Sequence, residues 1–194
     1  MSGTRILTMW SDGRTNEDDA QILRKPSVDI PIPIDSNGQR DIKILVNAFL
    51  ERDDALGLAA PQVGINKRVI VFRNKGFNEK EQIKSENDCD ILINPRITQA
   101  RGEKMSASEG CLSCPEIKAE VSRFPEIKVR ACDLNGRKIS ERYTDFLARI
   151  VQHEIDHLEG RLIIDYEGVV YFPRKRQEFF AWLFQEKLKE AKHV

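Results

Sequence analysis

Hydrophobic positions recur three or four residues apart in three stretches of the chain, and this spacing predicts amphipathic helices. The stretches are 40–53, 145–158 and 174–191. Thr144 precedes the second stretch and is suited to cap its start, whereas Gly160 follows it and would end the helix. The sequence therefore predicts three helices, with sharp limits for the middle one.

Two short runs of continuous apolar residues predict buried strands, at 68–72 and at 91–93. The second run is followed by Asn94 and Pro95. Because proline cannot donate a hydrogen bond to a neighbouring strand, we expect the second strand to stop there.

Apolar and charged residues alternate between 115 and 143, which is typical of strands with one buried face. Within this stretch, Asn135-Gly136 is a strong signal for a hairpin turn. Strand runs and helices occupy separate stretches, so we expect an α+β fold and not a parallel βαβ array.

The polar regions set the domain limits. Residues 1–20 have the character of an N-terminal extension, and 21–194 have that of a single domain. Residues 74–90 are charged and poor in apolar side chains, so they are interpreted as a surface insertion.

Composition argues against a nucleic-acid-binding, membrane or disulfide-rich secreted protein. The 31 basic and 31 acidic residues balance, so no overall charge draws the chain to nucleic acid or to a membrane. No apolar run approaches a transmembrane length, and the acidic N-terminus lacks the apolar core of a signal peptide. Four unevenly spaced cysteines are too few for a disulfide scaffold. These features predict a cytoplasmic protein.

A histidine motif carries the most specific chemical signal. Two of the three histidines, His153 and His157, lie four residues apart on the predicted helix and therefore share a face. Glu154 lies beside the first. This pattern indicates a metal-dependent hydrolase in which a glutamate handles protons. The alternative is an ordinary pair of histidines in a charged helix end.

The residues alone leave the third metal ligand open. Cys111, on a predicted loop before a strand, Glu178 and His193 are all candidates. Cys114 is a further option, because Cys-x-x-Cys together with both histidines could close a structural zinc site. That arrangement would leave Glu154 without a role.

Three segments, taken together, resemble the peptide deformylase family in order and separation. They are Gly57-Leu58-Ala59-Ala60-Pro61-Gln62, Glu109-Gly110-Cys111-Leu112-Ser113, and Gln152 to Gly160 with its core His153-Glu154-Ile155-Asp156-His157. Weaker similarity extends from about Ile22 to about Asp165. The joint match implies antiparallel strands wrapped around a central metal-binding helix, with a C-terminal helix.

The resemblance implies a role for each matching residue. The ligands of one divalent metal ion per chain would be Cys111, His153 and His157, with the fourth position open. Glu154 would take a proton from the attacking water and return it to the leaving amine. Gln62 and the backbone N–H of Leu112 would stabilise the oxyanion.

The same resemblance implies the cofactor, the substrate and the partners. Fe²⁺ is expected in cells, and Zn²⁺, Ni²⁺ or Co²⁺ would replace it. The activity would be removal of the formyl group from N-formylmethionyl nascent peptides, which could bring the enzyme to the ribosome near the exit tunnel. No nucleic-acid specificity and no membrane association are expected.

Substrate contacts follow from the resemblance as well. Leu56, Gly57 and the strand of 111–117 should pair with an extended peptide. Phe146 and Ile150, near the ligands on the helix, could line the methionine pocket. Ordinary core packing is the alternative for both.

Other positions matter through their expected partners or their departure from the family pattern. Glu109 is expected to pair with Arg123. Ala55 replaces a glycine that begins the first motif, and it would be strained only if that position needs a positive φ. Cys114 replaces an aliphatic residue and is interpreted as a small buried hydrophobe.

Two rival functions remain compatible with part of the sequence. A metallopeptidase could use Glu178 as third ligand, but Cys111 and Gln62 would then have no role. A non-enzymatic peptide-binding relative would be expected to lose a ligand or Glu154, and this chain keeps them all.

Overall fold

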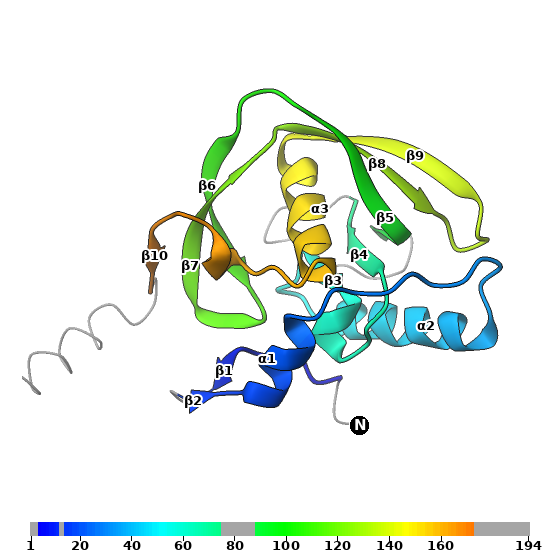
Figure 1. Cartoon of the computed structure of the whole chain (residues 1–194), viewed down its shortest axis with the longest axis horizontal. Coiled ribbons are helices and arrows are strands. Elements are labelled where there is room, and N and C mark those ends of the chain that lie inside the picture. The colour runs from blue at the N-terminus through cyan, green and yellow to red at the C-terminus, as the bar shows by residue number, and fades with distance from the viewer. Residues whose placement is uncertain (1–3, 12–13, 75–87, 173–194) are drawn as a thin grey trace, which may run out of the picture.

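In the computed structural model, antiparallel strands surround a central helix, α3 (Asp145–Leu158) (Figure 1). The structure describes residues 4–11, 14–74 and 88–172. This arrangement confirms the predicted α+β class. The predicted helix of 174–191 and most of the predicted insertion of 74–90 lie outside the described residues.

The limits of α3 agree with the sequence pattern. Thr144 is its N-cap residue in an extended conformation, although its side chain makes no capping hydrogen bond. Gly160 follows with a φ of 72°. A Cβ at that position would lie 2.3 Å from the carbonyl oxygen of Arg24, so the turn after α3 requires glycine for space as well as for φ.

Two other α-helices lie in the described residues, α1 (Glu17–Leu23) and α2 (Ser36–Leu50). The sequence did not predict α1. Helix α2 begins four residues earlier than predicted, because the Asp35 side chain caps it by accepting a hydrogen bond from Gly38 N at 2.7 Å. Short 3₁₀ turns occur at Ala60–Val63 and Ile163–Asp165.

A five-stranded antiparallel sheet has the order β3-β4-β5-β8-β9. Its strands are β3 (Gly57–Ala59), β4 (Val69–Arg73), β5 (Cys89–Arg101), β8 (Glu126–Cys132) and β9 (Lys138–Thr144). The predicted hairpin turn between β8 and β9 is confirmed, with Gly136 at a φ of 74°. Strand β3 forms one edge of this sheet.

The prediction that a strand stops at Asn94-Pro95 is wrong. Strand β5 continues to Arg101, with a register shift against β8 at these two residues. Asn94 has a φ of 54°, and its side-chain amide exchanges two 2.8 Å hydrogen bonds with the backbone of Ile30. The irregularity accommodates proline, because the ladder needs no N–H donor there.

A three-stranded antiparallel sheet has the order β10-β7-β6. Its strands are β6 (Met105–Cys111), β7 (Cys114–Arg123) and β10 (Val170–Tyr171). The sequence placed Cys111 on a loop, but it is the last residue of β6, an edge strand. A small ribbon pairs β1 (Trp10–Ser11) with β2 (Arg14–Thr15).

The core fills the space between these elements. Apolar side chains of α3 pack with those of the five-stranded sheet in one buried cluster, and α2 packs with β3 and β4 in another. Leu7 N donates to Gln62 O and Met9 N donates to Ser113 O, both at 2.8 Å, so the described start of the chain lies against the loops beside α3. No helix among the described residues has the length and apolar character needed to cross a bilayer.

Candidate metal centre

Three potential metal ligands meet where β6 ends beside α3. The donor atoms of Cys111, His153 and His157 all lie within 4.8 Å of one another. Cys111 Sγ is 3.3 Å from His157 Nε2, and the centroids of the two imidazole rings are 5.1 Å apart. The alternative third ligands, Glu178 and His193, lie outside the described residues.

Local structure explains why these three side chains converge. The histidines project from one face of α3, one turn apart. Cys111 is paired with Cys114 across the turn that joins β6 to β7, so the turn holds its side chain at the end of the hairpin. His157 is 1% exposed, while Cys111 and His153 are half-buried.

The chemistry of this donor set fits a divalent metal ion. A hydrogen bond from Cys114 lowers the pKa of the Cys111 thiol well below its usual value; burial raises it, and the nearby His157 lowers it further. A thiolate is the form of cysteine that binds metals. His153 uses Nδ1 to contact Glu109 at 2.9 Å, which leaves Nε2 for a metal. The free cysteines form no disulfide that would remove the thiol.

Glu154 lies beside the ligands with one oxygen unpaired. Its side chain is almost fully buried, and Oε2 has no hydrogen-bond partner among the described residues. Burial raises the pKa of Glu154, while His153 and His157 oppose this. A carboxylate with a raised pKa can accept and return a proton near neutral pH.

Gly57 allows the backbone of β3 to approach Glu154 closely. A Cβ at this position would lie 2.4 Å from Glu154 Oε1 and 2.8 Å from two carbons of that side chain. Any other residue would have to displace the carboxylate or the strand. The glycine therefore places the edge of the five-stranded sheet directly beside the candidate centre.

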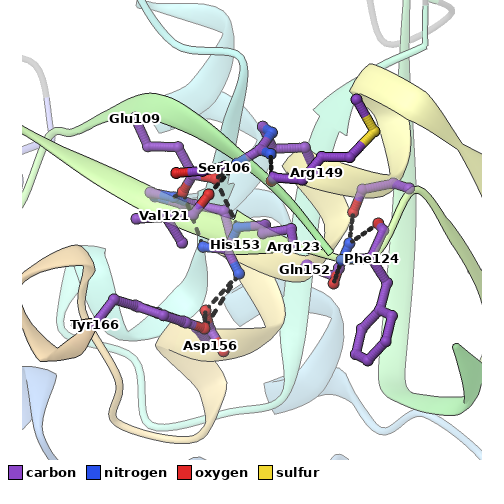
Figure 2. Close-up of polar contacts among 12 residues, drawn as sticks. Ser106, Glu109, Val121, Arg123, Phe124, Arg149, Gln152, His153, Asp156 and Tyr166 are labelled. Atoms are coloured by element: carbon purple, nitrogen blue, oxygen red, sulfur yellow. Dashed lines mark hydrogen bonds and ion pairs between the residues drawn. The ribbon is translucent and has the colours of Figure 1, made fainter. Parts of the chain in front are cut away.

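Glu109 lies on β6 and is saturated with hydrogen bonds (Figure 2). Arg123 donates to both of its carboxylate oxygens, at 2.6 and 2.9 Å, which confirms the predicted pairing. Arg149 donates to Oε1 at 2.6 Å, and His153 Nδ1 contacts Oε2 at 2.9 Å. Burial raises the pKa of Glu109, but hydrogen bonds from His153 and Arg123 outweigh it and bring the pKa to about 2.

The network continues along α3. Asp156 Oδ2 accepts from Arg123 at 2.7 Å and from the Tyr166 hydroxyl at 2.5 Å. On the neighbouring side, Gln152 bonds both backbone groups of Phe124, its Oε1 accepting at 3.1 Å and its Nε2 donating at 2.8 Å (Figure 2). Thus polar residues of the histidine motif that are not metal-ligand candidates fix α3 to the surrounding strands.

Gln62 reaches the turn that carries Cys111. It is 2% exposed on the 3₁₀ turn after β3. Its Oε1 accepts from Ala59 N at 2.9 Å, and its Nε2 donates to Ser113 Oγ at 3.2 Å. Leu112 occupies the same turn, partly buried against the core. The structure therefore brings Gln62 and Leu112 to the side of the centre where Cys111 lies.

The predicted substrate residues differ in exposure. Leu56 is 38% exposed and Phe146 is 47% exposed, so both have surface available to a ligand. Ile150 is 5% exposed and packs in the core cluster shared with the five-stranded sheet, so its pocket role stays a prediction. Ala55 is not among the residues with positive φ, and alanine is therefore unstrained there.

Sequence reasoning missed Arg149 and Tyr166. Arg149 is four residues before His153 on the same helix, so helical spacing could have placed it on the ligand face. Nothing in the local pattern around Tyr166 indicates that its hydroxyl contacts Asp156, since that contact depends on the path of the chain after α3.

Comparison with known proteins agrees with the site geometry. The family model for polypeptide deformylase matches residues 15–169. The chain is 35% identical over 155 residues to peptide deformylase 2 of Rickettsia conorii, covering 78% of this chain and 77% of that relative. It is 40% identical over 129 residues to the peptide deformylase of Desulforudis audaxviator, covering 66% and 75%.

Solved structures show the same likeness. A class I type b peptide deformylase from Acinetobacter baumannii, with Met-Ala-Ser bound, matches with a TM-score of 0.69 and 28% identity, covering 86% of this chain and all of that one. A peptide deformylase from Synechococcus elongatus in complex with actinonin matches with a TM-score of 0.66 and 31% identity, covering 84% and 77%.

Proposed function

This chain belongs to the polypeptide deformylase family, and from that premise we propose how its own residues divide the reaction among them. It is a metal-dependent hydrolase that removes the N-terminal formyl group from newly made polypeptides. The reaction adds water across a linear amide, so one proton must leave the water and one must reach the departing amine. Formate and a free α-amino group are the products.

Cys111, His153 and His157 are the proposed ligands of one divalent metal ion. When bound, the ion supplies a Lewis acid that polarises the formyl carbonyl and activates water. Support comes from the three donors within 4.8 Å and the lowered pKa of the Cys111 thiol. The ion proposed in cells is Fe²⁺, with Zn²⁺, Ni²⁺ or Co²⁺ as substitutes, since thiolate and imidazole ligands suit all of these ions.

Glu154 is the proposed proton carrier. It takes a proton from the attacking water through its unpaired Oε2 and later gives a proton to the amine nitrogen. Its burial favours the protonated intermediate form, because a buried carboxylate holds a proton more readily than an exposed one. Gly57 leaves room for the carboxylate at this place.

Gln62 and Leu112 are the proposed oxyanion donors. One N–H of Gln62 Nε2 contacts Ser113 Oγ, and no hydrogen bond among the described residues uses the other. The backbone N–H of Leu112 is the second donor. Donors fixed before the reaction stabilise charge that develops on the formyl oxygen without reorganising.

An extended peptide is proposed to bind between the two edge strands that flank the centre. Strand β3 is the edge of one sheet and β6 is the edge of the other, so each can pair with an added strand. Leu56 and Gly57 would contact the peptide from the β3 side. Strand β6 supplies the free edge on that side, and the predicted stretch of 111–117 begins at Cys111, the last residue of this strand.

Phe146 and Ile150 are retained as the proposed walls of the methionine pocket. The half-exposed ring of Phe146 supports this role better than the buried Ile150 does. The proposed substrates are N-formylmethionyl nascent peptides in the cytoplasm. Cosedimentation of the enzyme with ribosomes, at physiological salt, would test whether the exit tunnel region is also a partner.

The observation that carries this proposal is a cluster of three metal donors beside a buried glutamate, one of whose oxygens has no hydrogen-bond partner within the described ranges. Chelator-treated protein should be loaded anaerobically with Fe²⁺, Ni²⁺ or Co²⁺ and supplied with formyl-Met-Ala. Formate should be released by the loaded protein and not by the chelated protein. Equal rates with and without metal would contradict the proposal.

A further inference from the structure

Arg149 is not a proposed metal ligand, but it contacts a residue that contacts one. Its Nη1 donates to Glu109 Oε1 at 2.6 Å, and Glu109 Oε2 contacts the proposed ligand His153 at 2.9 Å (Figure 2). We propose that Arg149 is a positioning residue, which acts through Glu109 to fix the imidazole of His153 and thereby slows metal loss. This inference rests on the ligand set proposed above.

Charge balance gives Arg149 a role that Arg123 cannot fill alone. Arg123 faces two carboxylates, Glu109 and Asp156, at 2.6 and 2.7 Å. The side chains of these acids are only 6% and 15% exposed, so water solvates their charges poorly and they need nearby cations. Arg149 supplies the second cation, and the cluster then holds two guanidinium groups against two carboxylates.

Arg149 also joins three elements. Besides Glu109, its Nη1 donates to Val121 O on β7 at 2.8 Å, and its Nη2 donates to Met105 O on β6 at 2.5 Å. Arg149 itself lies on α3, four residues before His153. One planar side chain therefore ties both strands of the hairpin that ends at Cys111 to the helix that carries the histidines.

Removing Arg149 should loosen the site without dismantling it. The two hydrogen bonds from Arg123 to Glu109 would remain, and so would the contact between Arg123 and Asp156. Glu109 would lose one of the two donors on Oε1, and the hairpin would lose the hydrogen bonds that Arg149 donates to it from α3. Because the partner of a ligating histidine fixes its ring, a freer Glu109 should let the metal leave faster.

The test measures metal loss from Co²⁺-loaded holoenzyme to a chelator, alongside the visible absorption of the bound Co²⁺ and the melting temperature. Arg149→Met keeps much of the stem and removes the donors. Arg142→Met is the matched control, since Arg142 forms an exposed ion pair with Glu126 in the five-stranded sheet. Arg149→Met should lose metal about tenfold faster with an altered Co²⁺ spectrum, and the control should match wild type.

If Arg149→Met does not fold, Arg149→Lys carries the test. Lysine keeps the charge, but one ammonium group cannot reach three acceptors on two strands as the guanidinium does, so metal loss should still be faster. A lower melting temperature with wild-type metal loss and an unchanged Co²⁺ spectrum would overturn the proposal, because that is the result of a purely structural tie.

A double substitution tests whether the effect passes through Glu109. If it does, Arg149→Met should add little to the rate of metal loss once Glu109→Gln is present, whereas fully additive effects would overturn the proposed route. Cys111→Ser in the same series keeps the two proposals separable. Wild-type metal retention in Cys111→Ser would reject the ligand set itself, while rapid loss there and wild-type retention in Arg149→Met would reject only the role of Arg149.

Discussion

Two buried glutamates beside the same ligand set have opposite surroundings. Glu109 receives hydrogen bonds from two arginines and a histidine, and its pKa falls to about 2. Glu154 has an oxygen without a hydrogen-bond partner in the described part of the chain, and burial raises its pKa. The difference teaches that the surroundings of a carboxylate, and not its residue type, decide whether it orients a neighbour or carries a proton.

The comparison assumes that both glutamates flank a metal, so removal of a ligand should have the largest effect. Cys111→Ser should bind metal weakly and lose nearly all deformylase activity, because the thiolate is an inner ligand. Glu178→Ala should leave both properties unchanged. Metal content by elemental analysis and formate release check this. Normal metal in Cys111→Ser with loss in Glu178→Ala would move the protein to the metallopeptidase class.

Glu154→Gln should remove the proton carrier and leave the metal ligands in place. The variant should keep about one metal ion per chain, because the residue is not a ligand. Turnover should fall by roughly a thousandfold or more, since one group handles both proton transfers. Both quantities are measured on the same metal-loaded preparation. Turnover near that of wild type would refute the role of Glu154.

Gln62→Leu should sharpen the comparison, because it removes a hydrogen-bond donor that takes no part in proton transfer. Loss of one oxyanion donor costs about 3 kcal/mol, roughly a hundredfold, and the effect should appear mainly in kcat. Because Gln62 Oε1 also accepts from Ala59 N, the melting temperature should fall modestly. A lower melting temperature with unchanged kcat in the folded fraction would show that Gln62 only caps its loop.

Glu109→Gln should test the glutamate that orients its neighbour, through the pH dependence of folding stability. In metal-free protein, the pKa of Glu109 is about 2 in the folded state against 4.5 as the ordinary value. Its ionised form therefore stabilises the fold fully above pH 4.5, and this contribution of about 3 kcal/mol is lost as the pH falls toward 2.

Urea unfolding of chelator-treated wild type and Glu109→Gln, from pH 6 to the lowest pH at which both fold, measures this. The stability gap between them should narrow as the pH falls below 4.5. A gap that stays constant across that range would mean that the carboxylate of Glu109 has an ordinary pKa.

Local patterns predicted the centre of the molecule better than its edges. The limits of α3 and the hairpin at Gly136 follow from spacing and turn chemistry within a few residues. Strand β6 has few apolar residues because it is an edge strand, so its pattern was weak. The path of β5 through Pro95 depends on Asn94 bonding to Ile30, 64 residues away.

The site shows the same division. The motif residues were identified as site candidates from sequence because their spacing and resemblance are specific, and the structure brings Cys111, His153 and His157 together. Arg149 was missed, since an arginine in a helix usually indicates a solvated face. Its role depends on carbonyl groups of Met105 and Val121, 44 and 28 residues away, that no local pattern reveals.

A crystal structure of the zinc-loaded protein would test the central claim most directly. The claim is that Cys111, His153 and His157 hold one metal ion while both glutamates stay off it. We expect a sulfur at about 2.3 Å and two imidazole nitrogens at about 2.0–2.1 Å from the ion, with Glu154 uncoordinated beside the open position. An ion without Cys111 as ligand, or with an oxygen of Glu154 or Glu109 bound to it, would contradict the claim.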